Sequence, residues 1–122
     1  MDFNCNYPGS WRGEHRQPGA GPFPFSEPET RAVGEFSLAH SNIAGAMSYQ
    51  TTGGVILRPR CTAPDSDIPG HDLEALRGLG RCGTELTGHP VVSIFEGFTA
   101  DKRRLPVGSF IDFVHEDQGV LV

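Results

Sequence analysis

The stretch IAGAMSYQTTGG, residues 43–54, is the one that decides the fold class we predict. Its first half, Ile43 to Tyr49, is short and almost entirely apolar or small. A strand that is covered on both faces, as in a parallel sheet, has this composition because neither face meets water. Gln50 then opens a polar turn that ends in two glycines. Because open α/β sheets place their chemistry at strand ends, we expect an α/β protein with functional residues near Gln50.

The segment before this stretch predicts an amphipathic helix over residues 27–40. Ser26 and Glu29 have the spacing of a capping box, in which each side chain hydrogen-bonds the backbone of the other residue. Proline is tolerated in the first turn of a helix, and Pro28 falls there. Apolar residues recur at helical spacing and are expected to face the core: Ala32, Val33, Phe36 and Ala39.

The segments that follow alternate between strand-like and helix-like patterns. We predict strands at 55–57 and 91–95, helices at 72–86 and 109–116, and the start of a buried strand at 120–122. Gly88 should stop the second helix, whose internal glycines each weaken it by roughly 1 kcal/mol relative to alanine. This order is that of a piece of an α/β sheet.

Composition and charge narrow the possible partners. The net charge is −5 and no long basic run is present, which argues against nucleic acid and anionic membranes. The sequence has no 18-residue apolar stretch and no signal-peptide pattern at its start. Its three cysteines form no CxxC pair. We therefore expect no membrane association and take the cytoplasm as the default location.

The titratable clusters give weak signals when taken alone. The motif His71-Asp72-Leu73-Glu74 has the HxxE spacing of a zinc site. Ordinary first-turn acids of a helix explain it better, because no third ligand lies at a telling distance. The cluster His115-Glu116-Asp117 could be an acid–base site, but solvated residues at a helix end explain it better. The thiol of Cys5 is better explained as a buried or incidental cysteine than as a reactive one. These residues by themselves indicate no function.

Four segments in succession carry a resemblance to a known family. They are DFNCNYPGSW, GPFPFSEPETRAVGEF, SYQTTGGVILRP and GSFIDFVHEDQGVLV. Their order and spacing resemble the zinc metallocarboxypeptidases, of the carboxypeptidase A-like, bacterial type. The resemblance implies an α/β fold with a mixed sheet flanked by helices. It also implies zinc as cofactor, peptide C-termini as partners, and a reaction in which zinc-activated water removes C-terminal residues.

The resemblance also assigns family roles to particular positions. Asn4 and Cys5 stand where the family has an asparagine and an arginine that hold the substrate carboxylate. Gln50 stands where the family has a zinc-binding histidine, and Thr51 follows it. His115 stands where the family has a mobile tyrosine that closes over the substrate. Of these functional positions, only Asn4 keeps the family residue.

The same alignment of landmarks bears on domain organisation. In the family, an HxxE with two zinc ligands precedes the first landmark, and a catalytic glutamate follows the last strand. We therefore expect residues 1–122 to be a single incomplete domain, a central-to-C-terminal segment that lacks both regions. The expected function is a zinc carboxypeptidase-like protein that is inactive as written and binds no zinc itself.

Two other functions stay open. One is a non-catalytic module that binds peptide C-termini through Asn4, Thr51 and His115, with Cys5 in the same pocket. The other is an interaction protein that forms homo-oligomers through open sheet edges.

Overall fold

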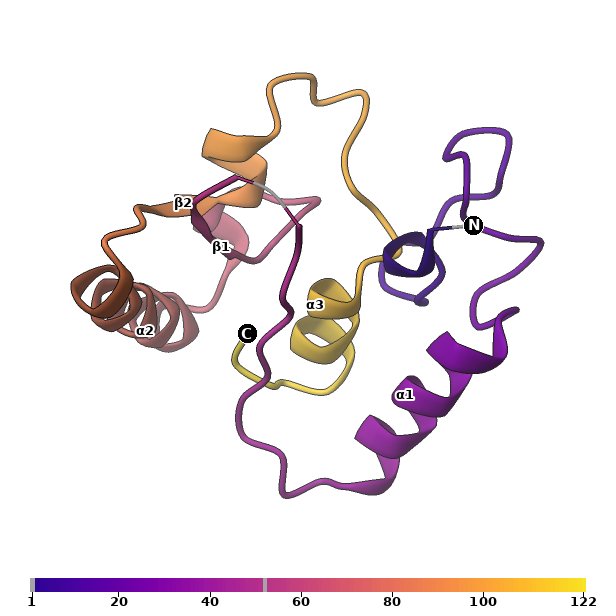
Figure 1. Cartoon of the computed structure of the whole chain (residues 1–122), viewed down its shortest axis with the longest axis horizontal. Coiled ribbons are helices and arrows are strands. Elements are labelled where there is room, and N and C mark those ends of the chain that lie inside the picture. The colour runs from indigo at the N-terminus through magenta and orange to yellow at the C-terminus, as the bar shows by residue number, and fades with distance from the viewer. Residues whose placement is uncertain (1, 52) are drawn as a thin grey trace.

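The computed structural model, which describes residues 2–51 and 53–122, has three α-helices and a small two-stranded sheet that lies beside the longest helix (Figure 1). The helices are α1 (Pro28–Ala39), α2 (Gly70–Thr87) and α3 (Phe110–Asp112), and the strands are β1 (Ile56–Arg58) and β2 (Val91–Ser93). Short 3₁₀ turns span Phe3–Cys5 and Asp65–Asp67, and π-helical turns span Ile94–Phe98 and Phe113–Asp117. In Figure 1, α3 lies in the middle of the molecule. The sheet and α2 lie on one side of it, and α1 and the N-terminal loops lie on the other side.

Strands β1 and β2 pair in parallel, with Ile56 opposite Val91 and Arg58 opposite Ser93. Helix α2 connects them and packs on both, as a parallel connection requires. Two of its glycines allow a close approach. A Cβ on Gly80 would lie 2.7 Å from a methyl of Val91, and one on Gly83 would lie 2.6 Å from Ile56. The predicted α/β class is confirmed, and the glycines that weaken α2 also let it sit against the sheet.

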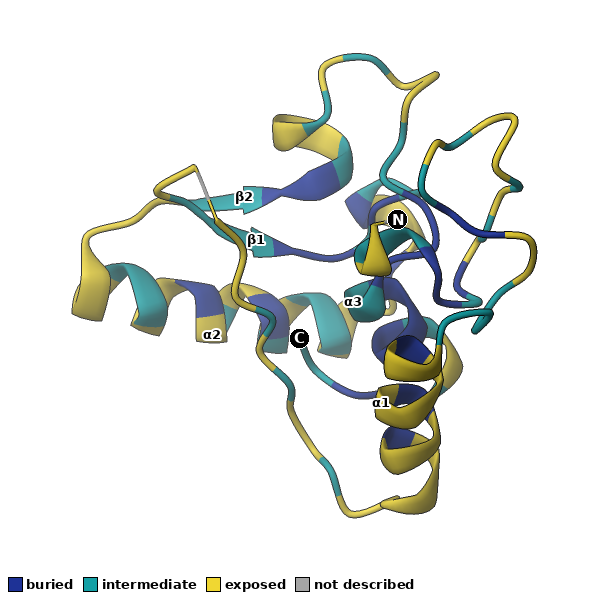
Figure 2. Ribbon diagram, turned by 45° about the vertical axis from the view of Figure 1, so that its right-hand side comes forward, coloured by how far each residue is buried: buried dark blue, intermediate teal, exposed yellow. Residues whose placement is uncertain are grey.

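The strand predicted over 43–49 is wrong. This stretch makes one isolated parallel bridge, between Gly45 and Leu121. Met47 and Tyr49 are 75% and 88% exposed, and Figure 2 shows the segment between α1 and β1 as mostly exposed. A run of small apolar residues becomes a buried strand only where neighbouring strands cover it, and here the contact is a single bridge at residue 121. The predicted start of a strand at 120–122 is reduced to the same bridge.

Helix α1 has the predicted position but neither the predicted cap nor the predicted buried face. Its N-cap is Glu27, whose side chain makes no capping bond, and the oxygen of Ser26 instead donates to Glu27 and accepts from Asn6. The buried residues are small ones, Thr30, Gly34 and Ser37, because the ring of Phe25 lies against Gly34. Val33 and Phe36 are 45% and 58% exposed.

The hydrophobic core is aromatic and lies between α3 and the N-terminal loops. Tyr7, Phe113, Val114 and Val120 are buried together. Tyr7 stacks on Phe113 at 5.7 Å between ring centroids and meets Phe110 edge-on at 5.4 Å. Such aromatic pairs contribute about 1 kcal/mol each beyond the area they bury. The helix predicted over 109–116 is therefore confirmed as a helical segment, and it anchors the N-terminal loops.

A buried ion pair fixes the end of β1. The guanidinium of Arg58 donates to both carboxylate oxygens of Asp65 at 2.6 Å, and Arg77 of α2 donates to the same carboxylate at 2.9 Å. These bonds, Arg58 first, lower the pKa of Asp65, which keeps the carboxylate ionised. Among the described helices, none is long and apolar enough to cross a bilayer.

Candidate functional site

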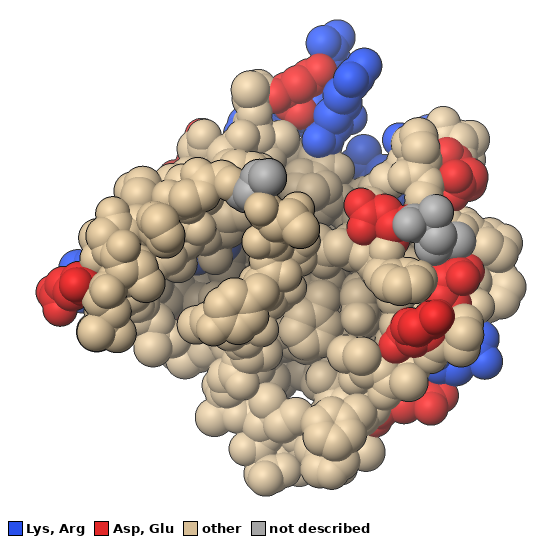
Figure 3. Space-filling view, in the orientation of Figure 1, with Lys and Arg blue, Asp and Glu red and all other residues tan. Residues whose placement is uncertain are grey.

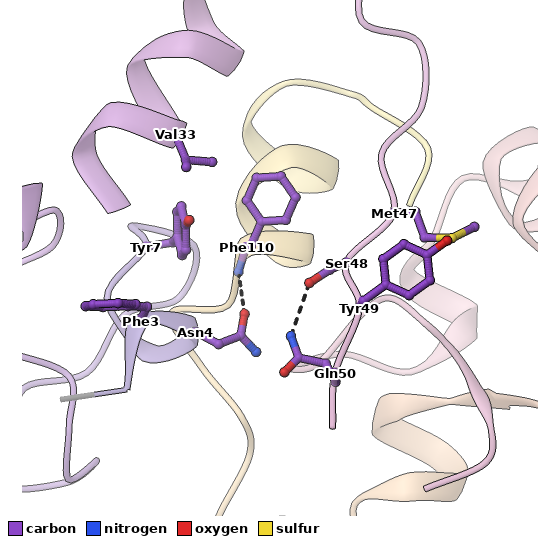
Figure 4. Close-up of a pocket in the computed structure, with 9 residues that line it drawn as sticks. All are labelled: Phe3, Asn4, Tyr7, Val33, Met47, Ser48, Tyr49, Gln50 and Phe110. Carbon is purple, nitrogen blue, oxygen red and sulfur yellow. Dashed lines mark hydrogen bonds between the residues drawn. The ribbon is translucent and has the colours of Figure 1, made fainter. Parts of the chain in front are cut away.

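Asn4 and Gln50, 46 positions apart in the chain, line the same pocket (Figure 4). Its volume is about 320 Å³. Phe3, Tyr7, Val33, Met47, Ser48, Tyr49 and Phe110 complete the lining. Aromatic and aliphatic side chains thus form the walls, and the polar groups come from a few residues at one end, a composition common in small-ligand sites.

The position of Asn4 is set by the first turn of the chain and by α3. The Asp2 carboxylate caps the 3₁₀ turn Phe3–Cys5 by accepting from the backbone N–H of Asn4 at 3.0 Å. The side-chain Oδ1 of Asn4 accepts from the backbone N–H of Phe110 at 3.1 Å. A backbone N–H can only donate, so this bond fixes which end of the amide faces α3. Nδ2 of Asn4 is then directed to the pocket.

Gln50 approaches the pocket from the exposed segment between α1 and β1. Its Nε2 donates to the hydroxyl of Ser48 at 3.1 Å, which leaves Oε1 as an acceptor. Figure 4 shows the amides of Asn4 and Gln50 on facing sides of the pocket. The local pairing with Ser48 spans only two residues, so the long-range placement of Gln50 depends on the bridge at Gly45.

The other residues singled out in the sequence lie elsewhere or outside the lining. Cys5 is half-buried beside the pocket, and burial raises the pKa of its thiol. Thr51 is exposed, next to residue 52, which lies outside the described residues. His115 is buried, with Nδ1 at 3.2 Å from the carbonyl oxygen of Val120. The structure therefore brings Asn4 and Gln50 together and does not bring His115 to them.

The donors at this pocket do not fit a zinc centre. Zinc sites in proteins use thiolate, imidazole and carboxylate ligands, whereas Gln50 and Asn4 offer amides and Ser48 a hydroxyl. An amide oxygen is a poor zinc ligand beside an imidazole nitrogen. Within residues 2–51 and 53–122, no three side chains of His, Cys, Asp or Glu come together as a metal site. The HxxE at His71 is a surface feature, with the imidazole 3.1 Å from the adjacent Asp72 carboxylate.

Asn6 is the residue that sequence reasoning missed. It is fully buried, and its Nδ2 lies within hydrogen-bond distance of the carbonyls of Ala20 and Phe23 and the hydroxyl of Ser26. Its Oδ1 accepts from the Thr30 hydroxyl at 2.6 Å and from the Glu27 N–H at 3.3 Å. The asparagine is visible in the sequence as part of the landmark DFNCNYPGSW. Its spacing gave no hint that it replaces the capping box of α1.

The side chains that line the pocket are uncharged. The pocket lining contains no Lys, Arg, His, Asp or Glu, and the nearest ionised group hydrogen-bonded to a lining residue is the carboxylate of Asp2. Figure 3 shows a face whose middle is largely uncharged, with acidic and some basic side chains along its right side and at its top. An anion entering this pocket would find amide donors and no cation.

The comparison with known families agrees with the fold and with the landmarks. A family model described as zinc carboxypeptidase matches residues 1–120. The match covers nearly the whole chain, and the chain therefore belongs to the zinc carboxypeptidase family. A search of curated proteins gives no match. Family membership makes peptides the class of molecule on which relatives of this chain act.

Proposed function

We propose that this chain is a carboxypeptidase-like unit that binds peptide ends in the pocket of Asn4 and Gln50 without hydrolysing them. Membership of the zinc carboxypeptidase family supports the peptide as ligand. The observation that carries the proposal is the polar composition of the pocket, which consists of side-chain amides, a hydroxyl and phenols.

Peptide hydrolysis of the family type needs a zinc-bound water and a base that titrates near neutral pH. The amides of Asn4 and Gln50 do not titrate, and they do not replace the imidazole and carboxylate ligands of zinc. The groups that remain can hydrogen-bond a peptide end and surround its last side chain with aromatic walls. Binding is what such a set of groups can provide.

The experiment combines binding and turnover in one sample. We expect peptides to shift the amide resonances of Asn4 and Gln50 in NMR spectra of the ¹⁵N-labelled protein, without cleavage products in the mass spectrum after prolonged incubation with zinc. Turnover that a chelator abolishes would contradict the absence of catalysis. Shifts confined to other parts of the molecule would contradict the assignment of the pocket.

A further inference from the structure

We propose that the pocket of Asn4 and Gln50 selects a neutral carboxamide, the C-terminal amide of a peptide, over a free C-terminal carboxylate. This inference rests on the proposed function, because it concerns the chemistry of the peptide end that the same pocket accepts.

Asn4 and Gln50 offer the pocket one hydrogen-bond donor and one acceptor. The Phe110 N–H occupies Oδ1 of Asn4, so Nδ2 is the group that faces the pocket as a donor. Nε2 of Gln50 donates to the Ser48 hydroxyl, so we assign Oε1 as the acceptor that Gln50 offers a ligand in this pocket. A carboxamide offers a carbonyl to the first and an N–H to the second. A carboxylate only accepts, and it would place an oxygen against Oε1 with no proton between them.

The charges near the pocket disfavour a carboxylate ligand. Carboxylates are held in proteins mainly by guanidinium groups, through two parallel charge-assisted hydrogen bonds. Cys5 stands beside Asn4 in the chain, and burial raises the pKa of its thiol, so the side chain is neutral near pH 7. The Asp2 carboxylate accepts from the backbone N–H of Asn4 at 3.0 Å, so the charge next to the Asn4 end of the pocket is negative and disfavours a second anion. Neither effect opposes a neutral amide.

Apolar side chains beside the two amides indicate which residue carries the peptide end. Phe3, Tyr49 and Val33 line the pocket and are 48%, 88% and 45% exposed. Large apolar side chains that are exposed together at a pocket mark a contact surface for an apolar group. The ligand is therefore a C-terminal amide carried on an aromatic or large aliphatic residue.

The test is a calorimetric or NMR titration of the 122-residue protein with two pentapeptides that differ only at the C-terminus, Phe-amide and Phe-carboxylate, at pH 7 and low salt. We expect the amide to bind about tenfold more tightly, which corresponds to one hydrogen bond of discrimination. The variant Asn4→Asp keeps an oxygen for Phe110 and loses the donor, so it should lower the affinity for the amide. The surface variant Cys82→Ser on α2 should leave both affinities unchanged.

The outcomes separate the two proposals. Binding of the carboxylate peptide with equal or higher affinity would overturn the selectivity and leave peptide binding intact. If neither peptide binds, the proposed function is wrong and the selectivity falls with it. A tighter amide complex whose affinity Asn4→Asp leaves unchanged would also contradict the inference, because the discrimination would then come from another group.

Discussion

The loop around Asn6 and the segment around Gln50 are held in place in opposite ways. Asn6 is fully buried, and its side chain joins two loops and the first turn of α1 through hydrogen bonds that span 14 to 24 residues. Gln50 is exposed, and its side-chain bond reaches two residues along the chain. Both lie in landmarks that resemble the family. The comparison separates a buried residue that holds the loops and α1 together from an exposed amide, which we propose stands at the position of a metal ligand in the family.

The largest effect is expected from Asn6→Ala. Removing the amide takes one hydrogen bond from each of Ala20, Ser26 and Thr30 at a buried position, and each lost bond costs about 1 kcal/mol. We expect a loss of about 3 kcal/mol in the free energy of unfolding, measured by urea denaturation. The matched control, Asn42→Ala in the exposed turn after α1, should change stability by less than about 0.5 kcal/mol. Equal effects of the two variants would remove the basis of the comparison.

A second buried scaffold residue, Asp112, should make stability depend on pH. Burial raises the pKa of its carboxyl from 3.8 to about 6, with the Cys61 N–H bond acting in the opposite direction. A raised pKa means that the ionised form is disfavoured in the folded state, so stability is lost as the pH rises from about 4 to about 6. The full difference corresponds to about 3 kcal/mol.

The variant Asp112→Asn isolates this effect, because it keeps an oxygen for Cys61 and cannot ionise. We expect the difference between the free energies of unfolding, variant minus wild type, to increase by about 3 kcal/mol from pH 4 to pH 7. If the free energies of unfolding of the two proteins changed with pH in parallel, the Asp112 carboxyl would ionise in the folded protein without loss of stability, which would contradict this prediction. The opposite trend from Asp65, whose pKa is lowered, is common to both proteins and cancels.

The smallest effect on stability is expected from Gln50→Ala. The side chain is exposed and pairs only with Ser48, so its removal should change the free energy of unfolding by less than about 0.5 kcal/mol. The same variant should weaken binding of the peptide amide, because Oε1 is lost. A destabilisation as large as that of Asn6→Ala would show that the two regions do not differ as described.

Much of the secondary structure follows from local signals. Pro28 marks the start of α1 and Gly88 marks the end of α2. Both helices begin and end within two residues of the predicted bounds. The prediction of a strand over 43–49 was wrong because a run of small residues becomes a buried strand only where partner strands cover it. A local pattern does not tell whether such partner strands exist. The prediction of the buried face of α1 was wrong because the small residues of the helix pack against Phe25. The loop before the helix sets this contact.

The site could be predicted only through the family resemblance. No spacing rule brings Asn4 to Gln50, because the contact depends on the bridge at Gly45 and on the bond from Phe110. The neutral character of the pocket depends on the side chains at those positions, and Asn4 and Gln50 are uncharged residues that can be read directly from the sequence. The role of Asn6 could not be read from the sequence, since its partners lie in three different turns.

The most direct test of the account places at position 50 the histidine that the family resemblance implies there. In Gln50→His, the imidazole would have as neighbours the Asn4 amide and the Ser48 hydroxyl, which together do not make a zinc site. We predict an amide spectrum close to that of the wild type, no zinc at one ion per chain by elemental analysis after dialysis, and no peptide cleavage. Stoichiometric zinc together with chelator-sensitive cleavage would contradict the claim that the scaffold is kept without the chemistry.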